Sequence, residues 1–104
     1  MSYDVWIENA RGQDLFALGA NYTYNVAPMF FHAVGSSPTR WDGKGAGEVA
    51  KLAIIALSAF GADPELYRAM NPPNGWGDFE GASEFLSAIY HACRAWPLHT
   101  FRCA

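Results

Sequence analysis

The chain has 104 residues, of which 51% are hydrophobic and only 16% are charged. This length excludes two domains of typical size, so we expect residues 1–104 to form a single domain with one core. The net charge of −3 and the scattered basic residues argue against non-specific nucleic-acid binding, which needs cations to neutralise phosphates. Because few charges are available to cover the surface, apolar side chains should stay exposed, and we expect a homo-oligomer.

The amino-terminal residues lack the basic and apolar regions of a signal peptide, and no apolar run approaches the roughly 18 residues of a membrane span. We therefore expect a cytoplasmic protein that does not enter a membrane. Cys93 and Cys103 should be reduced thiols in that compartment. They have no histidine cluster nearby, so we expect neither a metal site nor a cofactor.

The first segments predict a hairpin. Apolar and polar residues alternate over residues 3–8, and this period of two is typical of a half-buried strand. A turn over residues 9–13 should lead into a second strand over about residues 14–26, with a bulge or bend at Gly19. Beyond Gly19, one face of this strand presents three short polar side chains: Asn21, Thr23 and Asn25.

A short helix and a loop should follow. Residues 29–34 predict a helix whose first turn contains Pro28 and which stops at Gly35. Residues 36–47 are rich in Gly, Ser and Pro, and this composition predicts a loop.

The next helix is mostly apolar. It is expected over residues 48–60 and should end at Gly61. Ile54 and Ile55 lie outside its main apolar stripe, so a second helix or another subunit should cover them.

A further short helix should begin with Asp63 as its cap and Pro64 in its first turn, and should turn Leu66 and Met70 inward. The last helix should begin at Asp78 and stop at Pro97. Its apolar residues recur at steps of three and four: Phe79, Ala82, Leu86, Ile89, Cys93 and Trp96.

Residues 99–104 alternate again and predict a third strand beside the hairpin. This order of elements predicts an α+β fold. We expect a small antiparallel sheet, made of the N-terminal hairpin and the C-terminal strand, with three to four helices packed on one face.

The most informative segment covers residues 71–78, with the sequence NPPNGWGD. Two prolines stiffen it, and the glycines on either side of Trp76 permit backbone conformations that other residues resist. Such a loop favours a recognition surface in which the indole stacks on a planar ring. A tryptophan that plugs the core is the alternative.

We predict a ligand site formed by this loop and the polar strand face. Uncharged amides and hydroxyls suit the hydroxyls or base edges of a small polar, nucleotide-like molecule. A solvated strand face would present the same residues, and Asp78 also suits a helix cap. The predicted ligand-binding residues are Asn21, Thr23, Asn25, Asn74, Trp76, Asp78 and Arg40.

Two other clusters carry weaker signals. Residues 42–47 (DGKGAG) fail the spacing of a phosphate loop, although the amides that begin the next helix would suit an anion, helped by Arg40 and Lys44. Glu80, Glu84, Ser87 and His91 share one helical face and are better explained as a solvated stripe than as a metal site.

Catalytic motifs are missing from the sequence. It has no GxSxG or HExxH motif, and its three histidines, His32, His91 and His99, fall on separate predicted elements. We expect His32, beside two phenylalanines, to be packed in the core. No nucleophile, base and orienting group come together, so a non-enzymatic protein is favoured.

The chain resembles a family of small bacterial and phage proteins that has no settled activity. Two stretches carry the resemblance: NYTYNVAPM over residues 21–29 and PELYRAMNPPNGWGDFEGA over residues 64–82. The chain differs from the family's pattern at residues 54–57, which are apolar where charges are usual. The resemblance implies no catalytic residues.

Three functions remain open. The first is non-catalytic capture of a small nucleotide-derived molecule; by analogy with other compact phage proteins, this would be a sponge for an immune signal in the host cytoplasm. The second is a protein-binding module that inhibits or docks a host protein through exposed aromatic side chains and Ile54 and Ile55. An enzyme acting on a nucleotide is a more distant third.

Overall fold

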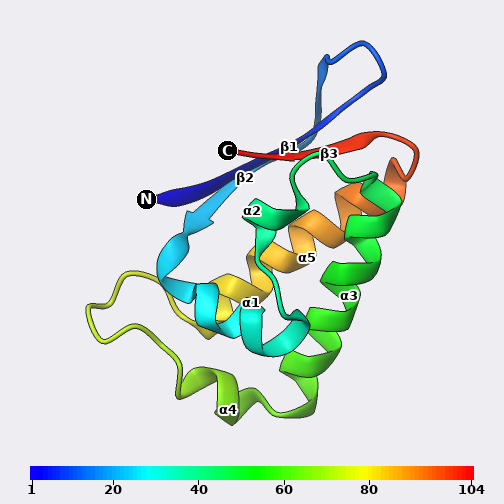
Figure 1. The fold of residues 1–104 in the computed structure, drawn as a ribbon. Coiled ribbons are helices and arrows are strands. Elements are labelled where there is room, and N and C mark those ends of the chain that lie inside the picture. Colours follow the sequence, from blue (N-terminus) through cyan, green and yellow to red (C-terminus); the bar gives the residue numbers. More distant parts are fainter.

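The computed structural model describes the backbone of residues 1–104 and every side chain except those of residues 16 and 17. Over this backbone the sheet has three strands, β1 (Ser2–Glu8), β2 (Asp14–Thr23) and β3 (Thr100–Cys103). Their spatial order is β2-β1-β3, and both pairs are antiparallel. The helices all lie on one side of the sheet (Figure 1), which confirms the predicted α+β fold.

The alternation in β1 places its apolar residues against the helices. Tyr3, Val5 and Ile7 are buried, whereas Asp4 between them is exposed. In β3, Phe101 and Cys103 pair with Ile7 and Val5 and are buried on the same side. The predicted third strand is therefore confirmed, and it lies beside β1 rather than beside β2.

Strand β2 is irregular at the predicted place and shorter than predicted. Its pairing with β1 shifts register next to Gly19. The strand ends at Thr23, whose Oγ1 accepts a hydrogen bond from the Asn25 amide at 3.2 Å and so begins the 3-10 turn η1 (Tyr24–Val26). The extension of this strand to residue 26 was wrong, because the threonine hydroxyl competes with the ladder for that amide.

The two edges of the sheet differ. The edge of β3 is covered by the chain before α3, since Phe101 N donates to Lys44 O at 2.9 Å and Gly43 N donates to Phe101 O at 2.8 Å. At the other edge, no further strand pairs with β2 over the described residues. Tyr24 N donates to Met1 O at 3.2 Å, so, by antiparallel alternation, the main-chain groups of Thr23 and Asn21 point away from β1.

Along residues 1–104 the α-helices are α1 (Ala27–Val34), α2 (Pro38–Trp41), α3 (Ala46–Ala62), α4 (Pro64–Arg68) and α5 (Phe79–Ala95). No helix among the described residues is long and apolar enough to cross a membrane.

Helix α2 lies inside the segment that was predicted to be a loop. It forms around Trp41, which has 0% of its surface exposed and whose Nε1 donates to Ser36 Oγ at 2.8 Å. One large buried side chain thus outweighs the loop-like composition around it.

Three helix details also differ from prediction. Helix α3 runs through Gly61, where nothing lies within 4 Å of an added Cβ, and ends one residue later. In α4 the buried residue is Tyr67, and Leu66 is 38% exposed. His32 is exposed rather than packed in the core, and its Nδ1 lies 3.2 Å from Tyr67 Oη.

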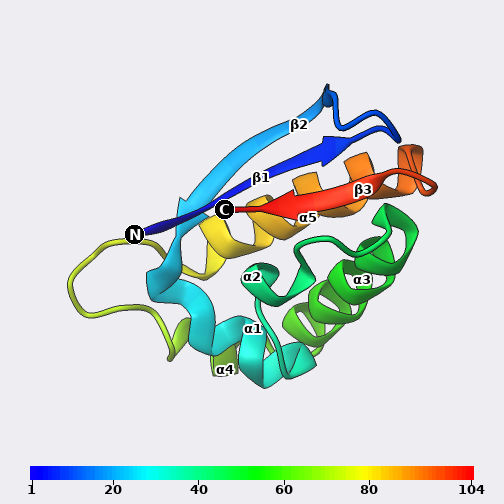
Figure 2. The ribbon, with the colours of Figure 1, turned by 45° about the horizontal axis from the view of Figure 1, so that its top comes forward.

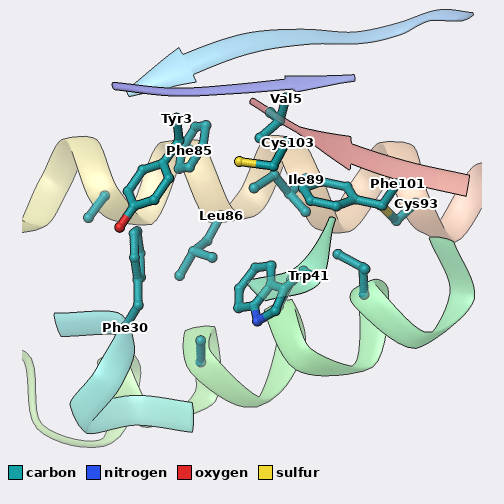
Figure 3. Close-up of a cluster of buried hydrophobic side chains, with 14 of the residues drawn as sticks. Tyr3, Val5, Phe30, Trp41, Phe85, Leu86, Ile89, Cys93, Phe101 and Cys103 are labelled. Atoms are coloured by element: carbon teal, nitrogen blue, oxygen red, sulfur yellow. The ribbon is translucent and has the colours of Figure 1, made fainter. Parts of the chain in front are cut away.

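Helix α5 passes beneath the sheet (Figure 2), as its apolar stripe predicts. The stripe is buried from Phe79 to Cys93, but Trp96 at the helix end is 42% exposed. Figure 3 shows Phe85, Leu86 and Ile89 between the sheet and the lower helices. This layer sets the position of the start of α5, and of the loop before it, relative to the end of β2.

Asp42 ties α2 to the edge of the sheet. Its Oδ1 accepts hydrogen bonds from Arg102 Nε at 2.8 Å and from the Cys103 amide at 2.9 Å. The bond from Arg102 has the larger effect, and together the two bonds lower the pKa of Asp42 below its usual value. The folded state therefore favours the ionised carboxylate.

We expect Asp42→Asn to lower the melting temperature at neutral pH, and the gap to wild type to narrow as pH falls. A lowered folded-state pKa stabilises the fold above the usual aspartate pKa of about 3.9, and this contribution disappears as pH falls through the lowered value. Thermal denaturation followed by circular dichroism across this range measures the gap. Asp14→Asn, at an exposed hairpin position, is the control; a gap that is constant with pH would contradict the charge argument.

Candidate functional site

The segment over residues 71–78, here called the Trp76 loop, is held together at its base. Asn71 Oδ1 accepts a hydrogen bond from the Phe79 amide at 2.8 Å, which closes the loop across its two ends. Just outside it, Arg68 Nε of α4 lies 3.1 Å from Glu80 Oε2 of α5. Glu80 therefore serves as an ion-pair partner that joins two helices, rather than as a free carboxylate.

The tip of the loop presents Trp76 to solvent. Asn74 Oδ1 accepts a hydrogen bond from the Trp76 amide at 2.9 Å, while Gly75 and Gly77 adopt φ of 76° and 97°. These left-handed conformations explain why glycine stands on both sides of the indole. The Trp76 side chain is 69% exposed, so it does not plug the core.

Tyr22 fastens the loop to the sheet. Its Oη accepts a hydrogen bond from the Asp78 amide at 3.0 Å. The tyrosine fits because Gly81 has no side chain: a Cβ there would overlap the Tyr22 hydroxyl. Likewise, a Cβ on Gly77 would lie 2.5 Å from Thr23 Cγ2. The end of β2 and the start of α5 are therefore in direct contact.

Between this end of β2 and the loop lies a concave site of about 700 Å³, here called the β2–loop hollow. This volume falls within the range of small-molecule sites. Five of the seven predicted ligand-binding residues line it, and no charged side chain does so among the residues described. Its lining consists of Met1, Ser2, Asn21, Tyr22, Thr23, Asn25, Asn74, Trp76 and Gly77.

The amides in the hollow are not equally available. Asn74 Oδ1 and Thr23 Oγ1 already accept hydrogen bonds from main-chain amides. Among the described residues, the side-chain amides of Asn21 and Asn25 have no hydrogen-bond partner, and both residues are exposed. The hollow can therefore offer two free amide groups, each with a donor and an acceptor, beside an exposed indole face.

Two predicted residues lie elsewhere. Asp78 caps α5 through a 2.7 Å hydrogen bond from the Gly81 amide to its Oδ1, and it does not line the hollow. Arg40 lines a separate concave site of about 410 Å³ with Trp41 and Lys44. The fold of residues 36–47 around Trp41 directs Arg40 to this second site, which the sequence does not reveal.

The amides that begin α3 are not free to bind an anion, because they are already paired. Gly43 N donates to Phe101 O, while Ala46 N and Gly47 N donate to His99 O at 2.7 Å and Pro97 O at 2.9 Å. The anion site suggested at the start of this helix was therefore wrong. These amides attach the start of α3 to the chain around β3.

The thiols are poorly suited to nucleophilic chemistry. Cys93 and Cys103 are free and buried. Burial raises the pKa of the Cys93 thiol to about 12. Burial is also the main cause that raises the pKa of the Cys103 thiol to about 11. Both thiols are therefore protonated at neutral pH.

Metal-binding side chains do not gather either. Among the side chains that are described, no group of three or more histidines, cysteines or carboxylates could hold a metal ion. In the predicted stripe on α5, Glu80 is instead paired with Arg68.

The structural roles of Tyr22 and Gly81 are not evident from the sequence. The alternation along the strand places Tyr22 only on the face opposite Asn21 and Thr23. Gly81 is the third residue of α5, where glycine costs about 1 kcal/mol relative to alanine. A glycine inside a helix can mark a close approach by another group, but Gly61 in α3 has nothing near it, so this signal alone does not single out Gly81.

Comparison of the chain with protein-family models, with curated protein sequences and with solved structures gives no match. The resemblance to small bacterial and phage proteins therefore stays a prediction, and the function has to be inferred from the geometry of the hollow.

We expect Gly81→Ala to destabilise the fold by about 1–3 kcal/mol, because the added methyl group displaces Tyr22 from the Asp78 amide. Chemical denaturation measures the loss. The matched control is Gly61→Ala in α3, which should be neutral or stabilise by up to about 1 kcal/mol, since its site is open.

A second background isolates the contact itself. In a Tyr22→Ala chain, Gly81→Ala should no longer be destabilising, because the group that it overlaps has been removed. An equal loss in both backgrounds would show that Tyr22 is not the cause.

Proposed function

We propose that the protein captures a small polar, nucleotide-derived molecule in the β2–loop hollow without transforming it. One observation supports this most directly: an indole that is 69% exposed borders a hollow lined by uncharged side chains. Leaving such a ring in water is unfavourable, and a planar ligand stacked on it would bury it. Amides beside the ring supply the directional hydrogen bonds that select a ligand.

The absence of catalytic groups around the hollow favours capture over turnover. Its described lining contains no carboxylate, imidazole, thiol or amine side chain. The hydroxyl of Tyr22 is engaged with the Asp78 amide. A ligand here would meet groups that bind it but no acid–base pair that could act on it.

The biological setting that we propose follows the resemblance to phage proteins. A small cytoplasmic protein that holds a nucleotide-derived signal would act as a sponge, lowering the free concentration of an immune messenger in the host. Its effect would depend on abundance and affinity rather than on rate.

We expect Trp76→Ala to weaken binding about 10- to 100-fold, because stacking on an aromatic side chain contributes about 1–3 kcal/mol per base. The fold should keep its stability, because the indole is mostly exposed. Isothermal titration calorimetry with a panel of nucleosides, nucleotides and cyclic dinucleotides gives the affinities. Thermal shift gives the stability.

Trp96→Ala is the matched control, since Trp96 is also a partly exposed tryptophan but follows the far end of α5. It should leave binding unchanged. Equal losses in both variants, or no binding by wild type across the panel, would contradict the proposed function.

A second candidate function is docking of a protein partner or of another copy through α3. Ile54 and Ile55 are 40% and 55% exposed, so the helices of this chain do not cover them fully. Exposed isoleucines side by side on a helix are typical of an interface. The expected homo-oligomer would use this face.

We expect Ile55→Glu to convert a discrete oligomer into monomers, because a carboxylate cannot be buried in such an interface without a partner. Native mass spectrometry of the purified protein measures the subunit number. Gln13→Glu, at an exposed position in the turn between β1 and β2, is the control and should change nothing. A monomeric wild type would contradict self-association and leave only a foreign protein partner.

A further inference from the structure

We infer that the β2–loop hollow holds the uncharged nucleoside part of its ligand, and that phosphate groups remain in solvent and add little affinity. This inference rests on the proposed function and defines the ligand class for the same site.

The charges around the hollow carry the first part of the argument. Phosphate sites are built from arginine and lysine side chains or from free main-chain amides. No cationic side chain belongs to the described lining of the hollow, although Met1, which carries the N-terminal ammonium group, is part of that lining. Arg40 and Lys44, the pair suited to an anion, line the other concave site, where Lys44 Nζ lies 3.8 Å from Glu48.

The nearest helix start gives no seat for an anion either. At the start of α5, the Asp78 amide donates to Tyr22 Oη, the Phe79 amide to Asn71 Oδ1 and the Gly81 amide to Asp78 Oδ1. The place where a phosphate would sit is taken by the Asp78 carboxylate. The negative charge of Asp78 would repel a phosphate directed towards this turn, whereas Glu80 in the same turn is paired with Arg68.

The groups that remain suit a heterocyclic base. Asn21 and Asn25 have free side-chain amides, and an amide pairs with a base edge that presents a donor beside an acceptor. The main-chain N–H and C=O of Asn21 and the N–H of Thr23 also point to the outer edge of β2, whereas the Thr23 C=O accepts the first hydrogen bond of η1. Trp76 supplies the face on which the base would stack, so ring recognition needs no charge.

The test compares each nucleoside with its 5′-monophosphate and 5′-triphosphate by calorimetry, in low and high salt. We expect the affinities within one series to agree to about threefold and to be nearly independent of salt, because no counterions are released when no phosphate is bound. Asn21→Ala should weaken the nucleoside and its phosphates by the same factor. Arg40→Ala should leave all of them unchanged.

The outcomes separate this inference from the proposed function. If phosphorylated ligands bind and nucleosides are more than about tenfold weaker, with a strong salt dependence, the inference is overturned while capture stands. A selective loss of phosphorylated ligands in Arg40→Ala would also overturn it. Binding of neutral saccharides without any nucleoside would assign the hollow to another uncharged ring and overturn both. No binding in any series would overturn the proposed function itself.

Discussion

The contact between Tyr22 and the glycines at the start of α5 determines the arrangement of the site. The tyrosine reaches from β2 to the Asp78 amide, and Gly81 leaves the space that its hydroxyl occupies. Gly77 leaves a similar space for Thr23. A strand and a helix start that are far apart in the sequence are thereby fixed side by side. Together with the core layer around Phe85, this contact sets the position of the polar end of β2 relative to Trp76.

The same contact explains why an exposed loop can hold a defined shape. The loop is closed by Asn71 at its base, shaped by Asn74 at its tip and fastened by Tyr22 at its side. Each bond restricts main-chain freedom before any ligand arrives. A ligand that binds such a preorganised site loses less of its affinity to ordering the protein. The helix cap formed by Asp78 and the glycine at position 81, which lowers helix stability, therefore both help to shape the site.

Local signals account for what could be predicted from the sequence. The alternation of Tyr3, Val5 and Ile7, the apolar stripe of α5 and the caps Asp63 and Asp78 each depend on residues close together in the chain. These signals are strong enough to predict the fold class and most element boundaries. They also predict that the loop and the polar strand residues can bind the same kind of ligand. Residue type alone determines which hydrogen-bonding and stacking groups each segment offers.

Distant contacts account for the errors. Trp41 forms a helix in a loop-like segment because the core beneath β3 accommodates it, and Tyr67 rather than Leu66 is buried because it packs on Phe60 with ring centroids 4.6 Å apart. Asn25 leaves the strand but still lines the hollow, because the turn capped by Thr23 stays near the loop. Arg40 was predicted to join the Trp76 loop in one ligand site, but it lines the second concave site instead. Its position depends on the burial of Trp41, which no local pattern reports.

The distribution of charged side chains determines which ligands the site can accept. Asp78 lies at the start of α5, directly after Gly77 of the hollow, and Glu80 beside it is paired with Arg68, whereas Arg40 and Lys44 lie at the second concave site. On the proposed function, this arrangement would discriminate against nucleic-acid strands, because a base that enters the hollow from a strand would bring phosphates near the Asp78 carboxylate. A free nucleoside, or a small molecule with its base turned inward, meets no such barrier. Selection of a small ligand over a polymer would then come from repulsion at the rim together with stacking at Trp76, and it would require no positive charge.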